Sequence, residues 1–324
     1  MSAFVARPSW LADAPDESPI NVDADLLGPL AQYAVGATDL FVNGAGGLWV
    51  DRGAGPVRES GWVADESSVR SLAVSLIAAG GRHLDDVSPA VDVRLGDGIR
   101  VHAVVPPIAT TGTSISIRMP RSRPWRLDDL VRAGSVNAAQ SEQLREIVLG
   151  RRNVLVSGAA GAGKTTLLAA LLGEVPTGER IVVLEDVAEL RIAHPHVVAL
   201  ETRQPNVEGV GRTSLDQLVR EALRMRPDRI AIGECRGPEL RELLAALNTG
   251  HSGSAGTVHA NSLADVPARL EALGAAAGIA PASLARQAAA AFDVVVHVER
   301  AGTGRRIAAI GDLTLAGDRL AVSE

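Results

Sequence analysis

The sequence predicts an α/β fold in which a domain with a mostly parallel sheet follows a smaller α+β domain. After residue 127, short apolar runs alternate with stretches of helical spacing, which is typical of a parallel sheet covered by helices on both faces. Before residue 119, short runs are separated by glycine and proline turns, with few helical stretches, which indicates an α+β arrangement. A glycine-rich segment at 158–166 lies between a predicted strand and a predicted helix.

The N-terminal part divides into a tail, a domain and a linker. Residues 1–22, with several acidic residues and prolines, are predicted to be a disordered tail. In the domain, residues 23–119, apolar spacing predicts helices over Ala24–Val35 and Glu66–Ala79. Five runs are predicted to be strands: Leu40–Val42, Leu48–Val50, Val91–Leu95, Arg100–Val105 and Ser114–Ile117. The proline- and arginine-rich residues 120–126 suit a linker.

The second domain, residues 127–324, is expected to contain the parallel sheet. Its predicted strands are short and rich in β-branched residues: Val154–Val156, Ile181–Leu184, Val197–Leu200, Ile230–Ile232 and Val294–Val298. Its predicted helices are Lys164–Leu172, Leu215–Met225, Glu239–Leu247, Val266–Ala275 and Ala282–Ala290.

Composition argues against several classes of protein. The net charge of −6 gives no general attraction for nucleic acid, so direct nucleic-acid binding is not expected. The single cysteine, Cys235, excludes an internal disulfide and a multi-cysteine zinc site. No apolar run approaches the roughly 20 residues that cross a bilayer. The N-terminus lacks a basic region followed by an apolar one, so we expect a cytoplasmic protein.

The segment from Gly158 to Thr166 carries the clearest chemical signal, because it matches the P-loop pattern G-x-x-x-x-G-K-[ST] between a strand and a helix. An ordinary glycine-rich turn is the alternative, and the full match in that context argues against it. In a P-loop, backbone N–H groups surround the phosphates, Lys164 bridges the β- and γ-phosphates, and the Thr165 hydroxyl ligates Mg²⁺. Lys164 is the one lysine among 32 basic residues, and its compact ammonium suits this position better than a guanidinium.

The sequence therefore predicts ATP and Mg²⁺ as cofactors. The predicted nucleotide-binding residues are Gly158, Ala159, Ala160, Gly161, Ala162, Gly163, Lys164, Thr165 and Thr166.

Acidic residues follow two predicted strands at the edge of the sheet where ligands bind. Glu185, Asp186 and Glu189 follow one strand, and Glu234 follows another. A carboxylate at such a position can hold Mg²⁺ or polarise the attacking water, so Thr165, Glu185 and Glu234 are the predicted metal-binding residues. Acidic residues at helix starts that only favour the helix dipole are the alternative.

Two histidines, His251 and His259, lie in a glycine- and serine-rich segment, Thr249–Ser262, that we expect to be a flexible loop. Such a loop suits sensing of the γ-phosphate. Metal binding by this pair is not expected, because eight residues separate them and no cysteine or carboxylate cluster accompanies them.

Four blocks in order, GAAGAGKTT, VLEDVAEL, RMRPDRIAIGECRGPE and TGHSGSAGTVHANS, resemble the Walker A, Asp-box, Walker B and His-box motifs of the type II/type IV secretion ATPase superfamily (GspE/VirB11-like). Within it, the tight-adherence (Flp) pilus assembly ATPases of the TadA/CpaF type look most similar. Further similar segments are TDLFVNG, DGIRVHAVVPPIATTGTSISIRMP and LETRQPNVEGVG, so the resemblance covers roughly residues 25–300.

The resemblance implies a P-loop (RecA-like) ATPase domain beside the small N-terminal domain, in a ring that is usually a homo-hexamer. It makes Glu234 the first choice for positioning the attacking water and Glu185 the second, with His259 a further catalytic candidate. Arg100 and Arg118 match arginines that can reach the phosphates, and a structural salt bridge is their alternative role. Weaker candidates for that task are Arg203, Arg226 and Arg236.

The implied function is a Mg²⁺-dependent ATPase motor that drives pilus assembly or type II/IV secretion. It would be recruited peripherally to the inner face of the plasma membrane by an integral membrane platform protein. The alternatives are a conjugation-type transfer ATPase and an ATP-binding scaffold without turnover. One departure from the family pattern is the pair Ala255 and Gly256, where a Leu-Ser/Thr pair is common, and we expect it to alter packing or coupling rather than remove activity.

Overall fold

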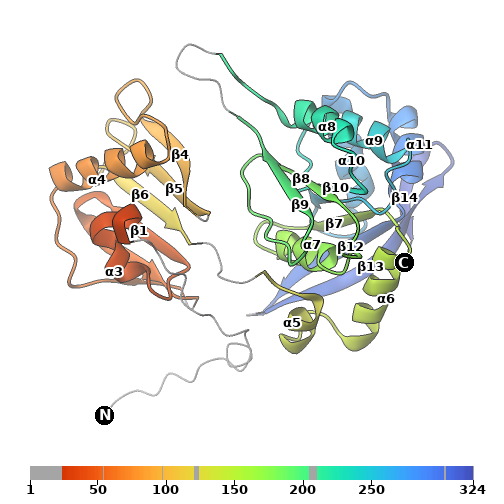
Figure 1. Ribbon diagram of the computed structural model, residues 1–324, viewed down its shortest axis with the longest axis horizontal. Coiled ribbons are helices and arrows are strands. Elements are labelled where there is room, and N and C mark those ends of the chain that lie inside the picture. Colours follow the sequence, from red (N-terminus) through yellow and green to blue (C-terminus); the bar gives the residue numbers. More distant parts are fainter. Residues whose placement is uncertain are drawn as a thin grey trace. The chain divides into compact units, whose positions relative to one another are not determined.

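The computed structural model describes residues 24–53, 55–96, 98–119, 124–203, 210–302 and 304–323 of the chain. Two compact units divide between Arg123 and Pro124 (Figure 1). The predicted tail at 1–22 and residues 120–123 of the predicted linker lie outside the described residues.

A six-stranded antiparallel sheet forms the centre of the N-terminal unit, in the order β3-β2-β1-β6-β5-β4. The strands are β1 (Asp39–Asn43), β2 (Leu48–Asp51), β3 (Pro56–Arg58), β4 (Ala90–Leu95), β5 (Ile99–Val104) and β6 (Ser114–Arg118). Every second residue of β4, β5 and β6 is buried, so one face of the sheet packs in the core. The helices that share this core are α2 (Ala24–Leu27), α3 (Ala31–Ala34) and α4 (Glu66–Ala79).

The first predicted helix, Ala24–Val35, is interrupted. A 3₁₀ turn at Gly28–Leu30 separates α2 from α3. Gly28 has a φ of +53°, and Pro29 has no backbone N–H to donate, so the α-helical pattern of hydrogen bonds cannot run through this point.

The C-terminal unit is built on an eight-stranded sheet in the order β14-β13-β12-β7-β11-β10-β8-β9. The six strands from β12 to β9 in this order are parallel to one another, while β13 is antiparallel to both β12 and β14. The predicted α/β fold with a mostly parallel sheet is therefore confirmed. The strands are β7 (Val154–Gly158), β8 (Ile181–Glu185), β9 (Val197–Glu201), β10 (Arg229–Ile232), β11 (Ala255–His259), β12 (Val294–Ala301), β13 (Gly304–Ala316) and β14 (Arg319–Ser323).

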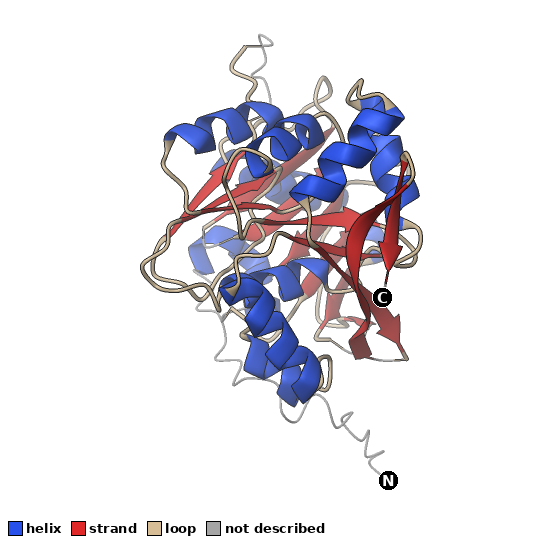
Figure 2. Ribbon diagram, turned by 90° about the vertical axis from the view of Figure 1, so that its right-hand side faces the viewer, coloured by secondary structure: helices blue, strands red, loops and turns tan. Residues whose placement is uncertain are grey.

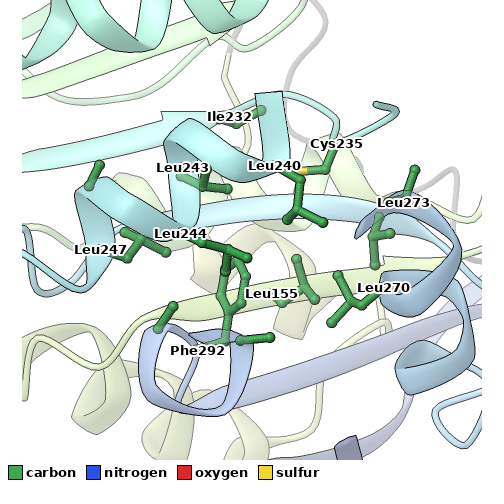
Figure 3. Packing of buried hydrophobic residues seen from close by; sticks show 14 of the residues in the cluster. Leu155, Ile232, Cys235, Leu240, Leu243, Leu244, Leu247, Leu270, Leu273 and Phe292 are labelled. Carbon is green, nitrogen blue, oxygen red and sulfur yellow. The ribbon is translucent and has the colours of Figure 1, made fainter. Parts of the chain in front are cut away.

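Helices cover both faces of this sheet (Figure 2). On one face lie α5 (Leu127–Arg132), α6 (Ala138–Leu149) and α7 (Lys164–Leu172), which share one core cluster. On the other face lie α8 (Leu215–Arg224), α9 (Glu239–Leu247), α10 (Val266–Ala276) and α11 (Pro281–Ala291). Figure 3 shows leucines of α9 and α10 converging on Leu155 and Phe292 in this second cluster. Burial on both faces explains why β7, β8 and β10 are mostly apolar.

One sequence-based expectation about this unit is wrong. The segment Thr249–Ser262, expected to be a flexible loop, contains the buried strand β11, which pairs in parallel with both β7 and β10. Strands β13 and β14 were not predicted at all, although they complete one end of the sheet. Among the described residues, no helix combines the length and apolar character that crossing a bilayer requires.

Candidate nucleotide site

The candidate site lies at the edge of the sheet where four parallel strands end. His259 pairs in register with Gly158 at the ends of β11 and β7, and Ile232 pairs with Leu184 near the ends of β10 and β8. Because parallel strands end at one edge, the residues that follow them gather around the P-loop.

The P-loop begins at Gly158 and passes into α7 at Gly163, which has a φ of +99°. A Cβ atom on Gly158 would lie 2.4 Å from the carbonyl oxygen of Val298, so this close approach to β12 requires glycine. Ala159, Ala160 and Gly161 are exposed, while Ala162 is buried. No side chain caps the first turn of α7, so its N–H groups suit an anion.

Lys164 is only 7% exposed and folds back over the loop. Its Nζ donates to the carbonyl oxygens of Gly158 and Ala159, at 3.0 Å each, and lies 3.5 Å from Nε2 of His259. Burial lowers the pKa of Lys164, and the negative charge of Glu234 opposes that effect. The ammonium is therefore a partly desolvated cation whose carbonyl contacts a phosphate can replace.

Glu234 is held between two partners. Its Oε2 accepts a hydrogen bond from Nη2 of Arg236 at 2.6 Å, and its Oε1 is hydrogen-bonded to Nδ1 of His259. Burial acts to raise the pKa of Glu234, but the hydrogen bonds from Arg236 and His259 and their charges outweigh it, so the pKa lies below its ordinary value. Glu234 is thus ionised at neutral pH, and Lys164, His259, Glu234 and Arg236 form a continuous polar chain.

Glu185 lies in a different environment. It is 4% exposed, and its carboxylate accepts hydrogen bonds from the backbone N–H groups of Glu189 and Leu190 at 3.0 to 3.2 Å. A Cβ atom on Gly233 would lie 2.7 Å from Cγ of Glu185, so these two chain segments are tightly packed. The carboxylate therefore orders the loop that follows β8.

Other predicted residues are spread around the unit. Nδ1 of His251 lies 3.1 Å from the carbonyl oxygen of Ala246, at the end of α9. Glu239 accepts hydrogen bonds from the backbone N–H groups of Arg236 and Gly237, as expected for an acidic residue at a helix start. Burial raises the pKa of the Cys235 thiol well above its ordinary value, which makes it a poor nucleophile.

The weaker arginine candidates differ in where they lie. Arg236 belongs to the polar chain, whereas Arg203 pairs with Thr213 in an isolated bridge. Arg226 follows α8 with a φ of +53°. Within the described ranges, no contact joins Arg203 or Arg226 to the P-loop.

Arg100 and Arg118 belong to the N-terminal unit, where they lie directly opposite each other on β5 and β6. Arg94 on β4 lies opposite Arg100 on its other side, and Asp39 on β1 lies opposite Arg118, so three arginines and one aspartate share one row of that sheet. Like charges in directly opposite positions destabilise a strand pair, and a bound anion relieves the repulsion.

One arginine at the P-loop was missed by sequence reasoning. Nε of Arg305, on β13, donates to the carbonyl oxygen of Gly161 at 3.0 Å. The two residues are 144 positions apart, and no motif marks Arg305, so only the pairing of β13 with β12 brings it to the loop.

The donor set fits a magnesium nucleotide. Among the described residues, no group of three or more His, Cys, Asp or Glu side chains could hold a metal ion by itself. Mg²⁺ usually takes one or two protein ligands together with substrate phosphates and waters, which matches the Thr165 hydroxyl and the nearby Glu234 carboxylate. The buried Lys164 ammonium and the uncapped start of α7 fit the phosphates.

Comparisons with known proteins show which proteins this chain is similar to. The family described as type II/IV secretion system protein matches residues 35–300. A putative conjugal transfer protein of Mycobacterium tuberculosis (strain H37Rv) is 52% identical over 87% of this chain and 82% of its own length. The conjugal transfer protein TrbB of Rhizobium radiobacter is 34% identical over 83% of this chain and 81% of its own length. Among solved structures, the pilus retraction motor PilT with bound ADP has a similar fold, with a TM-score of 0.62, 20% identity, and coverage of 85% of this chain and 78% of its own.

Proposed function

The chain belongs to the type II/IV secretion system protein family, and from this premise we propose that it is a Mg²⁺-dependent ATPase that drives type II/IV-type transport or pilus assembly. The observation that carries the proposal is the polar chain from Lys164 through His259 to Glu234 and Arg236, which joins the P-loop to an ionised carboxylate. A nucleotide-binding scaffold has no need of a carboxylate held in this way.

Lys164 and the backbone N–H groups at the start of α7 bind the phosphates in this proposal. Nζ of Lys164 exchanges its bonds to the carbonyl oxygens of Gly158 and Ala159 for bonds to phosphate oxygens. Thr165 and Glu234 are the proposed ligands of Mg²⁺ or of its waters, and the bound ion offsets the negative charge that develops on the phosphoryl oxygens.

Glu234 is the proposed group that positions the attacking water. Its low pKa keeps it ionised, and an ionised carboxylate accepts a hydrogen bond from water and so orients it. Glu185 is a weaker candidate, because its carboxylate is buried and already accepts backbone hydrogen bonds from Glu189 and Leu190. His259 bonds to Glu234 and approaches Lys164, which supports a role in coupling the carboxylate to the occupancy of the P-loop.

We further propose that Arg100 and Arg118 offset charge on the phosphoryl group during hydrolysis. The placement of Arg94, Arg100 and Arg118 side by side on β4, β5 and β6 supports an anionic ligand, since it brings three guanidinium groups to one row. Replacing Arg118 with glutamine should change stability little, since it removes both a repulsion from Arg100 and an attraction to Asp39, while turnover falls about 100-fold. Equal loss of stability and turnover would indicate a structural role.

The assembly and its partners are also proposals. We propose a homo-hexamer that acts at the cytoplasmic face of the membrane with an integral membrane platform protein. Relatives named as conjugal transfer proteins favour a conjugation-type role among the possible transport processes. With a net charge of −6, the chain gives no support to direct DNA handling, so the partner would contact any DNA.

Steady-state phosphate release with Mg²⁺-ATP tests the proposal, with the oligomeric state recorded in the same samples. The parent protein should turn over ATP, and Lys164→Ala and Glu234→Gln should each lower turnover by about 100-fold or more. Glu234→Gln should still bind ATP. The turnover of Glu185→Gln, compared with that of Glu234→Gln, distinguishes the roles of the two carboxylates. ATP binding without turnover, even in rings or with lipid present, would replace the motor with a scaffold.

A further inference from the structure

The hairpin formed by β12 and β13 lies against the P-loop. Residues Val294–His297 of β12 pair with Val154–Ser157 of β7, and β12 then continues to Ala301, past the paired part of β7 (Figure 1). The carbonyl oxygen of Val298 faces Gly158 closely enough to exclude a Cβ atom there. The hairpin therefore forms one wall beside the loop.

Arg305 extends this contact to the far side of the loop. Its Nε donates to the carbonyl oxygen of Gly161 at 3.0 Å. A Cβ atom on Gly163 would lie 2.9 Å from Cδ of Arg305, so the arginine side chain lies across the start of α7. On the same face of the hairpin, Arg300 lies directly opposite Arg305.

The strand order shows which end of a nucleotide meets this hairpin. The neighbours of β7 are β11 on one side and β12 on the other. His259 and Glu234, which act near Lys164, follow strands on the β11 side. Because the P-loop lysine reaches the β- and γ-phosphates, the nucleoside end extends toward the opposite side, where Arg305 lies.

Planar side chains commonly stack on a nucleotide base, and the C-terminal unit has few aromatic ones. From residue 124 onward, the aromatic side chains are those of Trp125 and Phe292. Phe292 is 1% exposed within a core cluster, and Trp125 packs against the other core cluster. A guanidinium group stacks on aromatic rings through its flat face, so this contact does not compete with hydrogen bonds made in its plane.

We propose that Arg305 binds the nucleoside part of ATP, with its guanidinium group stacked on the adenine base. The inference rests on the proposed function, because it requires ATP in the P-loop. It makes Arg305 a substrate-binding residue that distinguishes a nucleotide from a bare polyphosphate.

Calorimetric titration with Mg²⁺-ATP and with Mg²⁺-tripolyphosphate tests this role. Arg305→Ala and Arg305→Lys should each weaken ATP binding about tenfold or more, because both remove the planar stacking group. Affinity for tripolyphosphate should stay within about twofold, because the phosphate contacts remain. Arg306→Ala is the matched control, since Arg306 is the next residue on β13 and pairs with Glu299 instead.

Three results would overturn the assignment: unchanged ATP affinity in Arg305→Ala, equal losses for both ligands, or wild-type behaviour of Arg305→Lys. Equal losses would mean that Arg305 acts on the phosphates or on the loop itself. Wild-type behaviour of Arg305→Lys would mean that Arg305 contributes only its positive charge. A parent protein that binds ATP without turnover would refute the motor but leave the assignment of Arg305 testable, and a parent that binds no ATP would refute both.

Discussion

Nη2 of Arg236 donates a hydrogen bond to Oε2 of Glu234 at 2.6 Å, and only Cys235 separates the two residues in sequence. The guanidinium lowers the pKa of Glu234, whereas burial acts to raise it. Replacing Arg236 with alanine should therefore raise the pKa of Glu234 and move the acid limb of the rate–pH profile for ATP turnover to higher pH. Rates measured from about pH 3.5 to pH 8 check this, because the acid limb of the parent lies below the ordinary pKa of a glutamate.

Two variants separate this effect from a general loss of activity. Arg236→Lys keeps the charge and should restore part of the shift. Arg224→Ala removes an exposed arginine that pairs with Glu221 on α8, and it should leave the profile unchanged. An acid limb that stays in place in Arg236→Ala, with only a lower plateau, would show that Arg236 acts on something other than Glu234.

A buried ion pair should make a large contribution to stability. Arg229 is 1% exposed, and its Nε donates to Oε2 of Glu179 at 2.6 Å. Glu179 is 19% exposed and also pairs with Arg151, but its removal leaves the buried charge of Arg229 uncompensated, so Glu179→Ala should cost up to about 3 kcal/mol in free energy of unfolding. Replacing both partners, as Glu179→Ala with Arg229→Met, should recover part of that loss.

Urea denaturation of the parent, both single variants and the double variant forms a double-mutant cycle that measures the coupling. The recovery should be incomplete, because Arg229 also donates to the carbonyl oxygens of Val148 and Gly253. Strictly additive losses would contradict the prediction and indicate that the two side chains act independently.

The strands that could be predicted from the sequence are those that are buried along their whole length. All the residues of β7, β8 and β10 are buried, so each strand has a mostly apolar sequence that is easily recognised. Strand β11 escaped prediction because its residues Ala255 and Gly256 are small and carry little β propensity. Pairing on both sides, with β7 and β10, makes it a strand, and that information lies in distant parts of the chain.

The candidate site also contains some residues that could be predicted from the sequence and some contacts that could not. The P-loop is a local motif, so Lys164 and Thr165 could be named from sequence, and Glu234 followed from its position after an apolar strand. The hydrogen bond between Glu234 and His259 joins residues 25 positions apart, so it depends on how β10 and β11 pair. Arg305 was beyond reach, because its contact with Gly161 spans 144 positions.

Two glycines near the site should respond in opposite ways to alanine. A Cβ atom on Gly158 would lie 2.4 Å from a backbone oxygen of Val298, so Gly158→Ala should cost about 1–3 kcal/mol through overpacking. A Cβ atom on Gly256 would lie 3.7 to 4.0 Å from atoms of Ile232 and Cys235, which is ordinary van der Waals contact. Gly256→Ala should therefore gain about 0.5 kcal/mol by restricting the unfolded chain.

Urea midpoints of the two variants provide the comparison, and Gly256→Ala should keep the parent's affinity for ATP. A marked loss of stability in Gly256→Ala would show that this departure from the family pattern is required for packing. Parental stability in Gly158→Ala would mean that β12 can move away from the P-loop.

His297 should make stability depend on pH. It is 4% exposed, and its Nδ1 lies 2.9 Å from Oγ of Ser157, just before the P-loop. Burial lowers the pKa of His297, and the charge of Lys164 acts in the same direction, whereas Glu299 and Asp265 oppose both. Between the folded and unfolded pKa values the unfolded chain binds more protons, so stability falls as pH drops below about 6.5.

His297→Gln should keep a polar partner for Ser157 and remove this part of the pH dependence. The slope of unfolding free energy against pH should decrease by up to about 1.4 kcal/mol per pH unit just below pH 6.5. Urea unfolding at a series of pH values from 5 to 8 gives that slope. His83→Gln, at an exposed histidine of the N-terminal unit, is the control and should leave it unchanged. If His297→Gln keeps the parent's slope, the folded protein binds the His297 proton as readily as the unfolded chain does.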